Sequence, residues 1–380
     1  MIVSNTRIRK PRKDIVNDPN EPSFLDQAPD VQRTIVAAAD EKNDYFSPAA
    51  TDVMQCLSNT GTTLHGFFKQ ELDQRAAKQA QKLLIHVLQG KAVQVLEMAK
   101  TSPRLFFIKA TAEDYARDLA DNERTIERWS PYQAMFGTGD KDMLKAVKSY
   151  LDAYLDTIPD GRKMAAEQEQ EKFPDGFDYP PSTDEFNQLI NDLAEAITND
   201  TQLRTNWKNP SPATQVLLTK LREHYKPGIV KTGHHFNLSD LIKTDEICYQ
   251  KWSSNSWNWA QLTFFSVMAE GLQQRLLTAF QLQVACMGLD NYLNKNQPLI
   301  RNVEVMNYVT GKKITVAPFT SEDPLCRLGE GFVLDSYYGR GGATVWLFRT
   351  PRLLESYVKQ SQQSFRDLCT HQRNKRIRAV

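Results

Sequence analysis

The sequence predicts a mainly α-helical protein with a small antiparallel β-sheet near its C-terminal end. Apolar residues recur at three- and four-residue steps in most segments between residues 45 and 295, which is the spacing of a helix with a buried face. Short β-branched or aromatic runs separated by glycines follow only after Pro298, as is typical of strands joined in a hairpin.

The composition indicates a chain of more than one domain in a reducing compartment. A length of 380 residues corresponds to about two or three domains. The 47 Lys and Arg residues balance 46 Asp and Glu residues. The net charge therefore gives no reason to expect binding to nucleic acid or to an anionic membrane. The cysteines are odd in number and far apart, which indicates reduced thiols; they are Cys56, Cys248, Cys286, Cys326 and Cys369.

Residues 1–44 are expected to form a mobile N-terminal arm. They are polar and mixed in charge, and no apolar run follows the first basic residues, so no secretory signal peptide is expected. The basic cluster between Arg7 and Lys13 could contact phosphate groups or acidic surfaces, including the surface of a membrane. A solvated tail is the more common role of such a cluster.

Helical hairpins are expected next. The first turns at Gly90 and is stopped by a proline soon after its second helix. The second hairpin is opened by Ser130 and Pro131, turns at Gly139, and continues into a helix capped by Asp140. Each hairpin has one apolar face that it cannot bury alone, so the two are expected to stack.

The stretch 159–181 is the best internal boundary, because it combines three proline- and glycine-containing turn signals around a short charged helix. We expect a linker here, between a helical region at 45–158 and a C-terminal helical domain at 182–380. Cap signals in that domain predict helices at about 182–198, 211–225 and 237–251, and the apolar spacing predicts a final amphipathic helix at 351–369.

The segment Trp257–Tyr292 is predicted to be the central helix of this domain. It contains no proline, and its apolar residues occur on nearly every face, which is typical of a helix surrounded by protein. It is not expected to span a membrane, because several glutamines and charged residues interrupt it, and a span needs about 20 mostly apolar residues.

The small sheet is expected near residues 312–348. Gly339, Gly341 and Gly342 lie between its last two runs and predict a hairpin there; a phosphate cradle made by the backbone N–H groups of these glycines is the less common alternative. The three runs are 313–318, 331–336 and 344–348.

The second hairpin resembles the ankyrin repeat. Tyrosine and glutamine stand where that repeat has leucine and histidine, and the matching residues are Ser130, Pro131, Tyr132, Gln133, Ala134, Gly139 and Asp140. The turn glycines of the two hairpins lie about 50 residues apart, against about 33 in the usual repeat, and a charged insertion at 108–128 accounts for the excess. This ankyrin-like resemblance implies stacked helix pairs that bind partners through a concave face and loop tips.

Three segments together resemble a group of Legionella effector proteins of the Dot/Icm type IV secreted class, and they cover about half of the chain. They are Ala112–Leu151, Val230–Trp252 and Trp257–Leu289. The resemblance implies translocation into a eukaryotic host cell and action in the host cytosol, which agrees with the reduced cysteines. The biochemical function of the group is largely unassigned, so the resemblance implies a setting more than a mechanism.

His234 and His235 are the most prominent candidates for chemistry. Neighbouring residues of a regular element point apart, so two adjacent histidines rarely bind one metal ion, and loop or capping roles are more common. The chain has no P-loop, no HExxH motif and no paired CxxC motif. We expect no metal and no cofactor.

A cysteine-dependent hydrolase or transferase is the sharpest enzymatic hypothesis. Cys326 is the only cysteine in a loop-like context with glycines nearby, and a nucleophilic thiol needs a histidine or a helix N-terminus to lower its pKa. His234, His235 or His371 would supply that partner, and with His234 or His235 the site would lie between the two halves of the chain. A small buried thiol is the more common role.

Two groups of residues are candidate contact surfaces. Trp252, Trp257 and Trp259 could form a stacking or lipid-contact patch with the phenylalanines that follow, although their helical spacing favours the core. The charged insertion and the tryptophan after it are the candidate partner-binding residues: Arg117, Arg124, Arg128 and Trp129. The expected function is therefore that of an effector that binds host proteins, without nucleic acid and without a transmembrane segment.

Overall fold

The computed structural model describes residues 63–112, 125–226, 228–295, 297–299, 303–307, 313–316, 333–335, 340–342 and 350–377. The expected N-terminal arm lies outside these residues. The chain divides into two units, Met1–Arg75 and Ala76–Val380, and the contacts reported below lie within the second.

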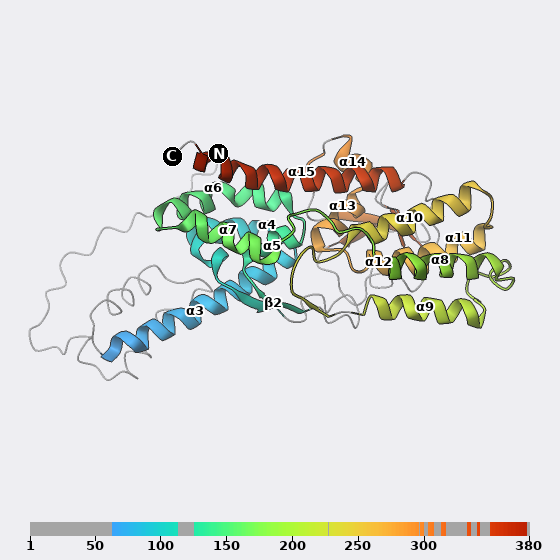
Figure 1. The fold of residues 1–380 in the computed structure, drawn as a ribbon, viewed down its shortest axis with the longest axis horizontal. Coiled ribbons are helices and arrows are strands. Elements are labelled where there is room, and N and C mark those ends of the chain that lie inside the picture. Colours follow the sequence, from blue (N-terminus) through green and yellow to red (C-terminus); the bar gives the residue numbers. More distant parts are fainter. Residues whose placement is uncertain are drawn as a thin grey trace, which may run out of the picture. The chain divides into compact units, whose positions relative to one another are not determined.

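The described part of the chain is mostly helical (Figure 1), which confirms the predicted mainly α class with a small β component. The α-helices are α3 (Thr63–Leu88), α4 (Ala92–Thr101), α5 (Pro131–Gly137), α6 (Lys141–Thr157), α7 (Gly161–Lys172), α8 (Asp184–Asn199), α9 (Pro212–His224), α10 (Leu238–Ser253), α11 (Trp259–Phe265), α12 (Gly271–Gln274), α13 (Ala279–Met287), α14 (Leu289–Leu293) and α15 (Thr350–Ile377). A 3₁₀-helix, η2 (Pro103–Phe107), and a π-helix, η4 (Ser266–Glu270), complete the set.

In the part of the chain that the structure describes, two small sheets accompany the helices. In the first, β1 (Ala110–Ala112) pairs antiparallel with β2 (Thr125–Trp129), and β2 pairs parallel with β3 (Ile229–Val230). The sequence did not predict this sheet, because β3 has only two residues and comes from a distant part of the chain. The second sheet has the strand order β5-β4-β7-β6 and consists of β4 (Val303–Asn307), β5 (Lys313–Val316), β6 (Val333–Asp335) and β7 (Arg340–Gly342).

A hairpin is present near residue 340, since β6 pairs antiparallel with β7, but its second strand begins at Arg340 and so contains two of the glycines that were expected in the turn. The glycines proposed as a phosphate cradle are partly contained in it: Gly341 and Gly342 belong to β7, where Gly341 lies opposite Leu334 of β6. The predicted run 344–348 lies outside the described residues.

The two predicted helical hairpins are present, with the expected caps. Ser130 and Gln133 form a capping box at the start of α5, and the Asp140 carboxylate accepts a hydrogen bond from the backbone N–H of Met143 at the start of α6. The turn glycines Gly90 and Gly139 have φ angles of +68° and +75°, a left-handed conformation that costs other residues about 1–2 kcal/mol. These local signals explain why the sequence places the hairpins correctly.

The first core lies between these hairpins and α7. It buries Trp129 and Phe136 completely or nearly so, together with apolar side chains of α3, α4 and α6. The region 159–181 contributes to it: Ala165 is fully buried, and the Gln168 side chain donates to the backbone carbonyl of Phe107 at 2.9 Å. Residues expected to link domains thus include a helix packed into this core.

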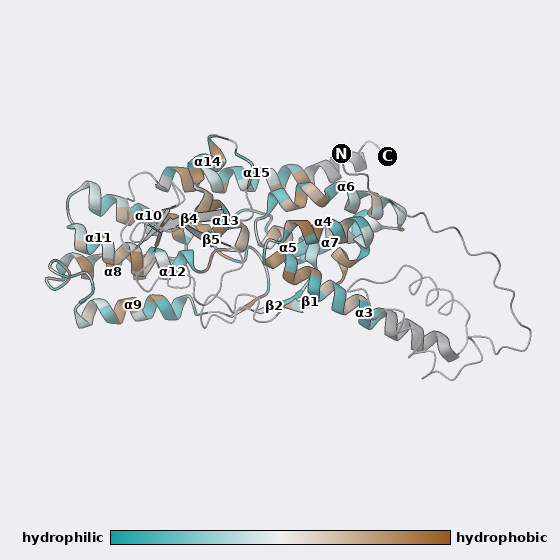
Figure 2. Cartoon of the chain, turned by 180° about the vertical axis from the view of Figure 1, so that it is seen from behind, coloured by the Kyte–Doolittle hydropathy of each residue, from teal (hydrophilic) through white to brown (hydrophobic). Residues whose placement is uncertain are grey.

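The predicted single helix Trp257–Tyr292 is broken twice, which corrects the sequence-based expectation: α11, η4 and α12 run on without a gap from Trp259 to Gln274, and α13 and α14 follow as separate helices. The chain leaves the helical path after Gln274, and Thr278 starts α13 with a capping box to Gln281. Gly288 then ends α13 with a φ of +91°. The segment is buried as predicted, and α13 is largely hydrophobic (Figure 2).

The glutamines of this segment are buried and bind groups of the elements around it. Gln261 donates to the carbonyl oxygen of Ile197 at 2.6 Å, and Gln273 donates to the Thr244 hydroxyl at 2.6 Å. The Gln274 amide accepts from the backbone N–H of Leu334 at 2.7 Å and donates to its carbonyl at 2.8 Å. The amide therefore pairs with β6 as a neighbouring strand would.

The last helix, α15, belongs to two cores. Its first part buries Leu354, Tyr357 and Val358 in the second core, around α13 and α14, whereas Phe365 packs into the first core. A third core joins α8, α9 and α10 to α11 and η4. Among the described residues, no helix is long and apolar enough to cross a membrane.

We expect Gln274→Met to lower the free energy of unfolding by about 2–4 kcal/mol, because it leaves the buried N–H and C=O of Leu334 without their side-chain partner and each such group costs about 1–3 kcal/mol. Urea denaturation followed by circular dichroism measures the change. Gln250→Met, at an exposed position of α10, is the matched control and should change stability by less than about 0.5 kcal/mol. Equal losses in the two variants would contradict the role assigned to Gln274.

Candidate functional site

The two histidines lie on the crossing segment, residues 229–235, which runs from β3 along the first core toward α10. Its backbone is bonded to that core at several points. The Trp129 indole donates to the carbonyl of Val230 at 3.0 Å, Gly233 N–H donates to the carbonyl of Lys172 at 2.7 Å, and His235 N–H donates to the carbonyl of Gly137 at 2.8 Å. This placement gives both rings a packed environment.

The His234 ring is stacked on Tyr179, with 3.7 Å between ring centroids, and its Nε2 donates to the carbonyl of Phe177 at 2.9 Å. Nδ1 has no hydrogen-bond partner. Burial lowers the pKa of His234 to about 4, because a second ring proton would have no acceptor. The imidazole is therefore neutral at pH 7 and holds the loop that contains Phe177.

The His235 ring is only 5% exposed and meets Trp129 edge-on, with 4.8 Å between ring centroids. It also presses against the backbone of α5: a Cβ placed on Gly137 would lie 2.3 Å from its Nε2. His235 thus fills the space that Gly137 leaves open, and its geometry is that of a packing residue.

The proposed thiol nucleophile, Cys326, lies outside the described residues. Cys248 and Cys286 are buried, and Cys369 is half-buried. Burial raises the pKa of the Cys248 thiol, and the nearby Glu270 carboxyl raises it further. Cys248 is therefore held as a protonated thiol, the form that does not act as a nucleophile.

The candidate partner-binding residues are only partly described. Arg117 and Arg124 lie outside the described residues, whereas Arg128 is exposed at a bulge in β2. Trp129 is fully buried, so its side chain serves the first core and is inaccessible to a partner in this fold.

The proposed aromatic patch is mostly core. Trp257 is 4% exposed and donates to the Thr198 hydroxyl at 2.8 Å, and the two phenylalanines that follow it in α11 are buried as well. Trp252 is half-buried, and Trp259 is 46% exposed at the start of α11.

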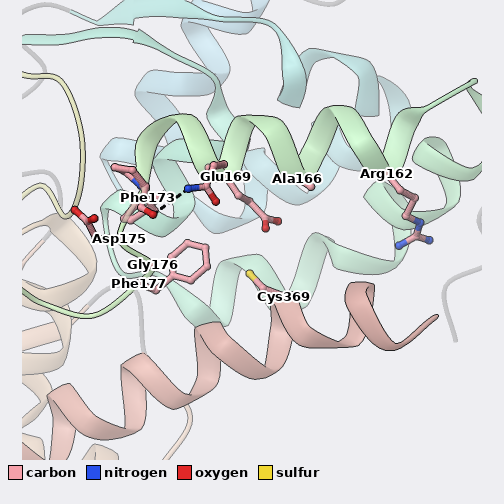
Figure 3. Close-up of a pocket in the computed structure, with 10 residues that line it drawn as sticks. Arg162, Ala166, Glu169, Phe173, Asp175, Gly176, Phe177 and Cys369 are labelled. Carbon is pink, nitrogen blue, oxygen red and sulfur yellow. Dashed lines mark hydrogen bonds between the residues drawn. The ribbon is translucent and has the colours of Figure 1, made fainter. Parts of the chain in front are cut away.

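A pocket that the sequence did not suggest lies between α7 and α15. Its volume is about 480 Å³. Figure 3 shows Glu169 of α7, Phe177 of the following loop and Cys369 of α15 directed into this space. The remaining lining residues are Arg162, Ala166, Gln170, Phe173, Pro174, Asp175 and Gly176.

The walls of the pocket are held by contacts behind them. Phe177 stacks on Phe136, with 4.8 Å between ring centroids, and the Tyr132 hydroxyl donates to Glu169 Oε1 at 2.5 Å. The Gln170 amide donates to the carbonyl of Pro174 at 2.9 Å, which closes the loop after α7 (Figure 3). The pocket is therefore formed before any ligand arrives.

Arg162 is the basic residue of the pocket lining. Arg162 donates to Asp156 at 2.8 Å and to Asp152 at 3.1 Å, and hydrogen bonds to Asp156 raise its pKa. Its positive charge is thus matched by two carboxylates outside the pocket. Glu169 and Asp175 are the acidic residues of the lining, beside Phe173 and Phe177.

Sequence reasoning missed this pocket because its two walls are about 200 residues apart, at residues 162–177 and at Cys369. The short helix at 161–172 is strongly polar and has no clear apolar face in its sequence, so it gave no signal of the packing behind the pocket. Within the described residues, no three His, Cys, Asp or Glu side chains come together as metal ligands.

Comparison with protein-family models, with curated protein sequences and with solved structures gave no match for this chain. The candidate site therefore stands on its geometry.

We expect the parent protein to lose about 3 kcal/mol of stability through His234 as the pH falls from 6.5 to 4. Above pH 6.5 the imidazole is neutral in both states. Below it the unfolded chain binds a proton that the folded chain, with its pKa of about 4, does not bind, so folding weakens.

His234→Gln keeps a donor for Phe177 and does not titrate. The free energy of unfolding of both proteins is measured by denaturant titration at several pH values. The difference between the two proteins separates the contribution of His234 from that of the carboxyl groups. A difference that stays constant between pH 7 and pH 4 would show that His234 does not have a lowered pKa.

Proposed function

We propose that this protein works by binding another protein, and that the pocket between α7 and α15 is a contact site. The observation that carries the proposal is the pocket itself. A volume of about 480 Å³ lies within the range of about 300–1,000 Å³ found for ligand sites. An aromatic floor beside a few polar groups is also the usual composition of such a site.

The rigidity of the walls supports the same function. Phe177 is held from behind by Phe136 and through its backbone by His234. A binding site that is already ordered loses less conformational entropy when it is filled, and that difference appears as affinity. The pocket could therefore accept one anchoring side chain of a partner, as the centre of an interface often does.

We further propose that the partner is a host-cell protein and that this chain is a translocated effector. The support for this setting is the resemblance of three segments to type IV secreted effectors and the reduced cysteines that the sequence indicates. Translocation is tested separately from binding, by fusing the chain to a reporter enzyme that acts only in the host cytosol.

Ala166→Trp is expected to abolish partner binding, because an indole on the pocket face of α7 would fill the space. Affinity purification from eukaryotic cell lysate, with mass spectrometry, should yield a near-stoichiometric partner for the parent protein and none for this variant.

Glu167→Trp is the control for Ala166→Trp, since Glu167 is exposed on the same helix outside the pocket lining. It should retain the partner. A partner that survives Ala166→Trp would remove the pocket from the interface. A covalent change of host proteins without a partner would instead support the cysteine-dependent enzyme and direct attention to Cys326.

A further inference from the structure

We propose that His234 is an acid-sensitive latch on the wall of the pocket, and that a second proton on its ring opens the loop that carries Phe177. The latch is a means of regulating the same site, and only its consequence for a partner rests on the proposed function. Three observations carry it: the position of the ring behind the aromatic wall, a buried ring nitrogen that has no acceptor, and a glycine hinge next to the ring.

His234 lies directly behind the aromatic wall of the pocket. Its Nε2 donates to the carbonyl of Phe177 at 2.9 Å, and its ring meets Phe173 edge-on, with 5.5 Å between ring centroids. Both phenylalanines line the pocket. The ring is also stacked on Tyr179, at 3.7 Å between centroids. One imidazole therefore supports three aromatic residues of the stretch 173–179.

The loop in front of His234 depends on this support. Residues 175–178 form no helix or strand, and Asp175, Gly176 and Asp178 are exposed. Phe177 stacks on Phe136, at 4.8 Å between centroids, but apolar contact is not directional, whereas a hydrogen bond is. The bond from His234 thus fixes where the backbone of Phe177 lies, and its loss would let the loop move.

A second proton on the His234 ring has no place in the closed wall. Part of the ring is exposed, but Nδ1 is buried and has no hydrogen-bond partner. Both nitrogens of an imidazolium are donors, and a buried charge without partners is strongly unfavourable. Burial accordingly lowers the pKa of His234 to about 4, against the opposing effects of the Phe177 carbonyl and of Asp178.

The charged groups around the ring leave this situation unchanged. Asp178 is paired with Arg366 at the surface, and the Lys172 ammonium, directed at the carbonyl of Lys231 at 3.1 Å, would repel an imidazolium. The titratable and charged groups of the surrounding elements are Asp178 and Tyr179 in the loop, Lys231 and His235 on the crossing segment, Lys172 of α7 and Arg366 of α15.

Gly233 gives the ring a route to solvent. Its φ of +74° lies in the left-handed region that glycine adopts readily, and nothing lies within 4 Å of a Cβ placed on it. The neighbouring Thr232 is exposed. Rotation at this glycine would break the 2.7 Å bond from its N–H to the carbonyl of Lys172 and carry the ring outward, as hinge residues do.

The direction of the pH effect follows from the two positions of the ring. In the open wall the ring is in water, and its pKa returns to about 6.5; in the closed wall the pKa is about 4. Acid therefore favours opening as the pH falls below 6.5, and the gain levels off below about pH 4. The ratio of open to closed wall should rise about 20-fold between pH 7 and pH 5.

Hydrogen–deuterium exchange of the full chain, read by peptide mass spectrometry, tests the latch. The wall peptides contain residues 173–179 and 230–236. A peptide of residues 186–197, from α8 in the third core, reports unfolding beyond the wall. After correction for the intrinsic effect of pH on exchange, we expect the protection factors of the wall peptides to fall about 20-fold from pH 7 to pH 5. They should stay below that of the α8 peptide.

His234→Gln keeps a donor for Phe177 and cannot gain a charge, so its wall peptides should change by less than about threefold. His224→Gln, at an exposed histidine of α9, is the matched control and should behave as the parent does. Unchanged protection in the parent, or an equal fall in His234→Gln, would overturn the latch. Equal protection of the wall and α8 peptides at pH 5 would also overturn it, because the wall would then open only when the protein unfolds.

The consequence for a partner is tested with the same variants. A partner captured at pH 7 by the immobilised parent protein should be eluted at pH 5 and should remain on His234→Gln. Retention by the parent at pH 5, with the wall open by exchange, would overturn the regulation of binding. Absence of any partner at pH 7 counts against the proposed function alone, because the exchange experiment decides the latch without a partner.

Discussion

The structure depends on one constraint, which is the burial of amide side chains inside the segment Trp257–Tyr292. This segment is apolar on most faces and is surrounded by the rest of the protein, so its glutamines are buried along with its leucines and phenylalanines. A buried amide without partners costs several kcal/mol. The surrounding elements are placed where these amides find backbone or hydroxyl partners, and the cores are joined at those points.

The amides connect parts of the chain that are distant in sequence. Gln261 binds the end of α8, Gln274 binds β6, and the Gln281 amide donates to the Tyr179 hydroxyl at 3.2 Å. The Thr278 hydroxyl, which caps α13, also donates to the carbonyl of Thr138 at 2.7 Å in the turn of the second hairpin. Hydrogen bonds are directional, so these contacts orient the hairpins and the sheet about α13 in a way that apolar packing alone would not.

The positions of the pocket walls follow from this arrangement. α15 reaches it because its first part is packed on α13 and α14 and its later part on the first core. The loop at Phe177 reaches it because His234, on the crossing segment, holds the Phe177 carbonyl. The same histidine loses its contribution to stability in acid, so the pocket wall and the pH dependence of folding share one residue.

By itself, the sequence determined the local elements. The caps at Ser130, Asp140, Thr183 and Ser211 and the turn glycines act over three or four residues, so the helix boundaries they predict agree with the structure. Only the tertiary structure decided the breaks in the central segment, the parallel pairing of β3 with β2, and the pocket. The strand pairing and the pocket depend on groups about 100 to 200 residues apart, which packing and hydrogen bonding bring together. The breaks have local caps at Thr278 and Gly288, which the continuous apolar pattern of the segment concealed.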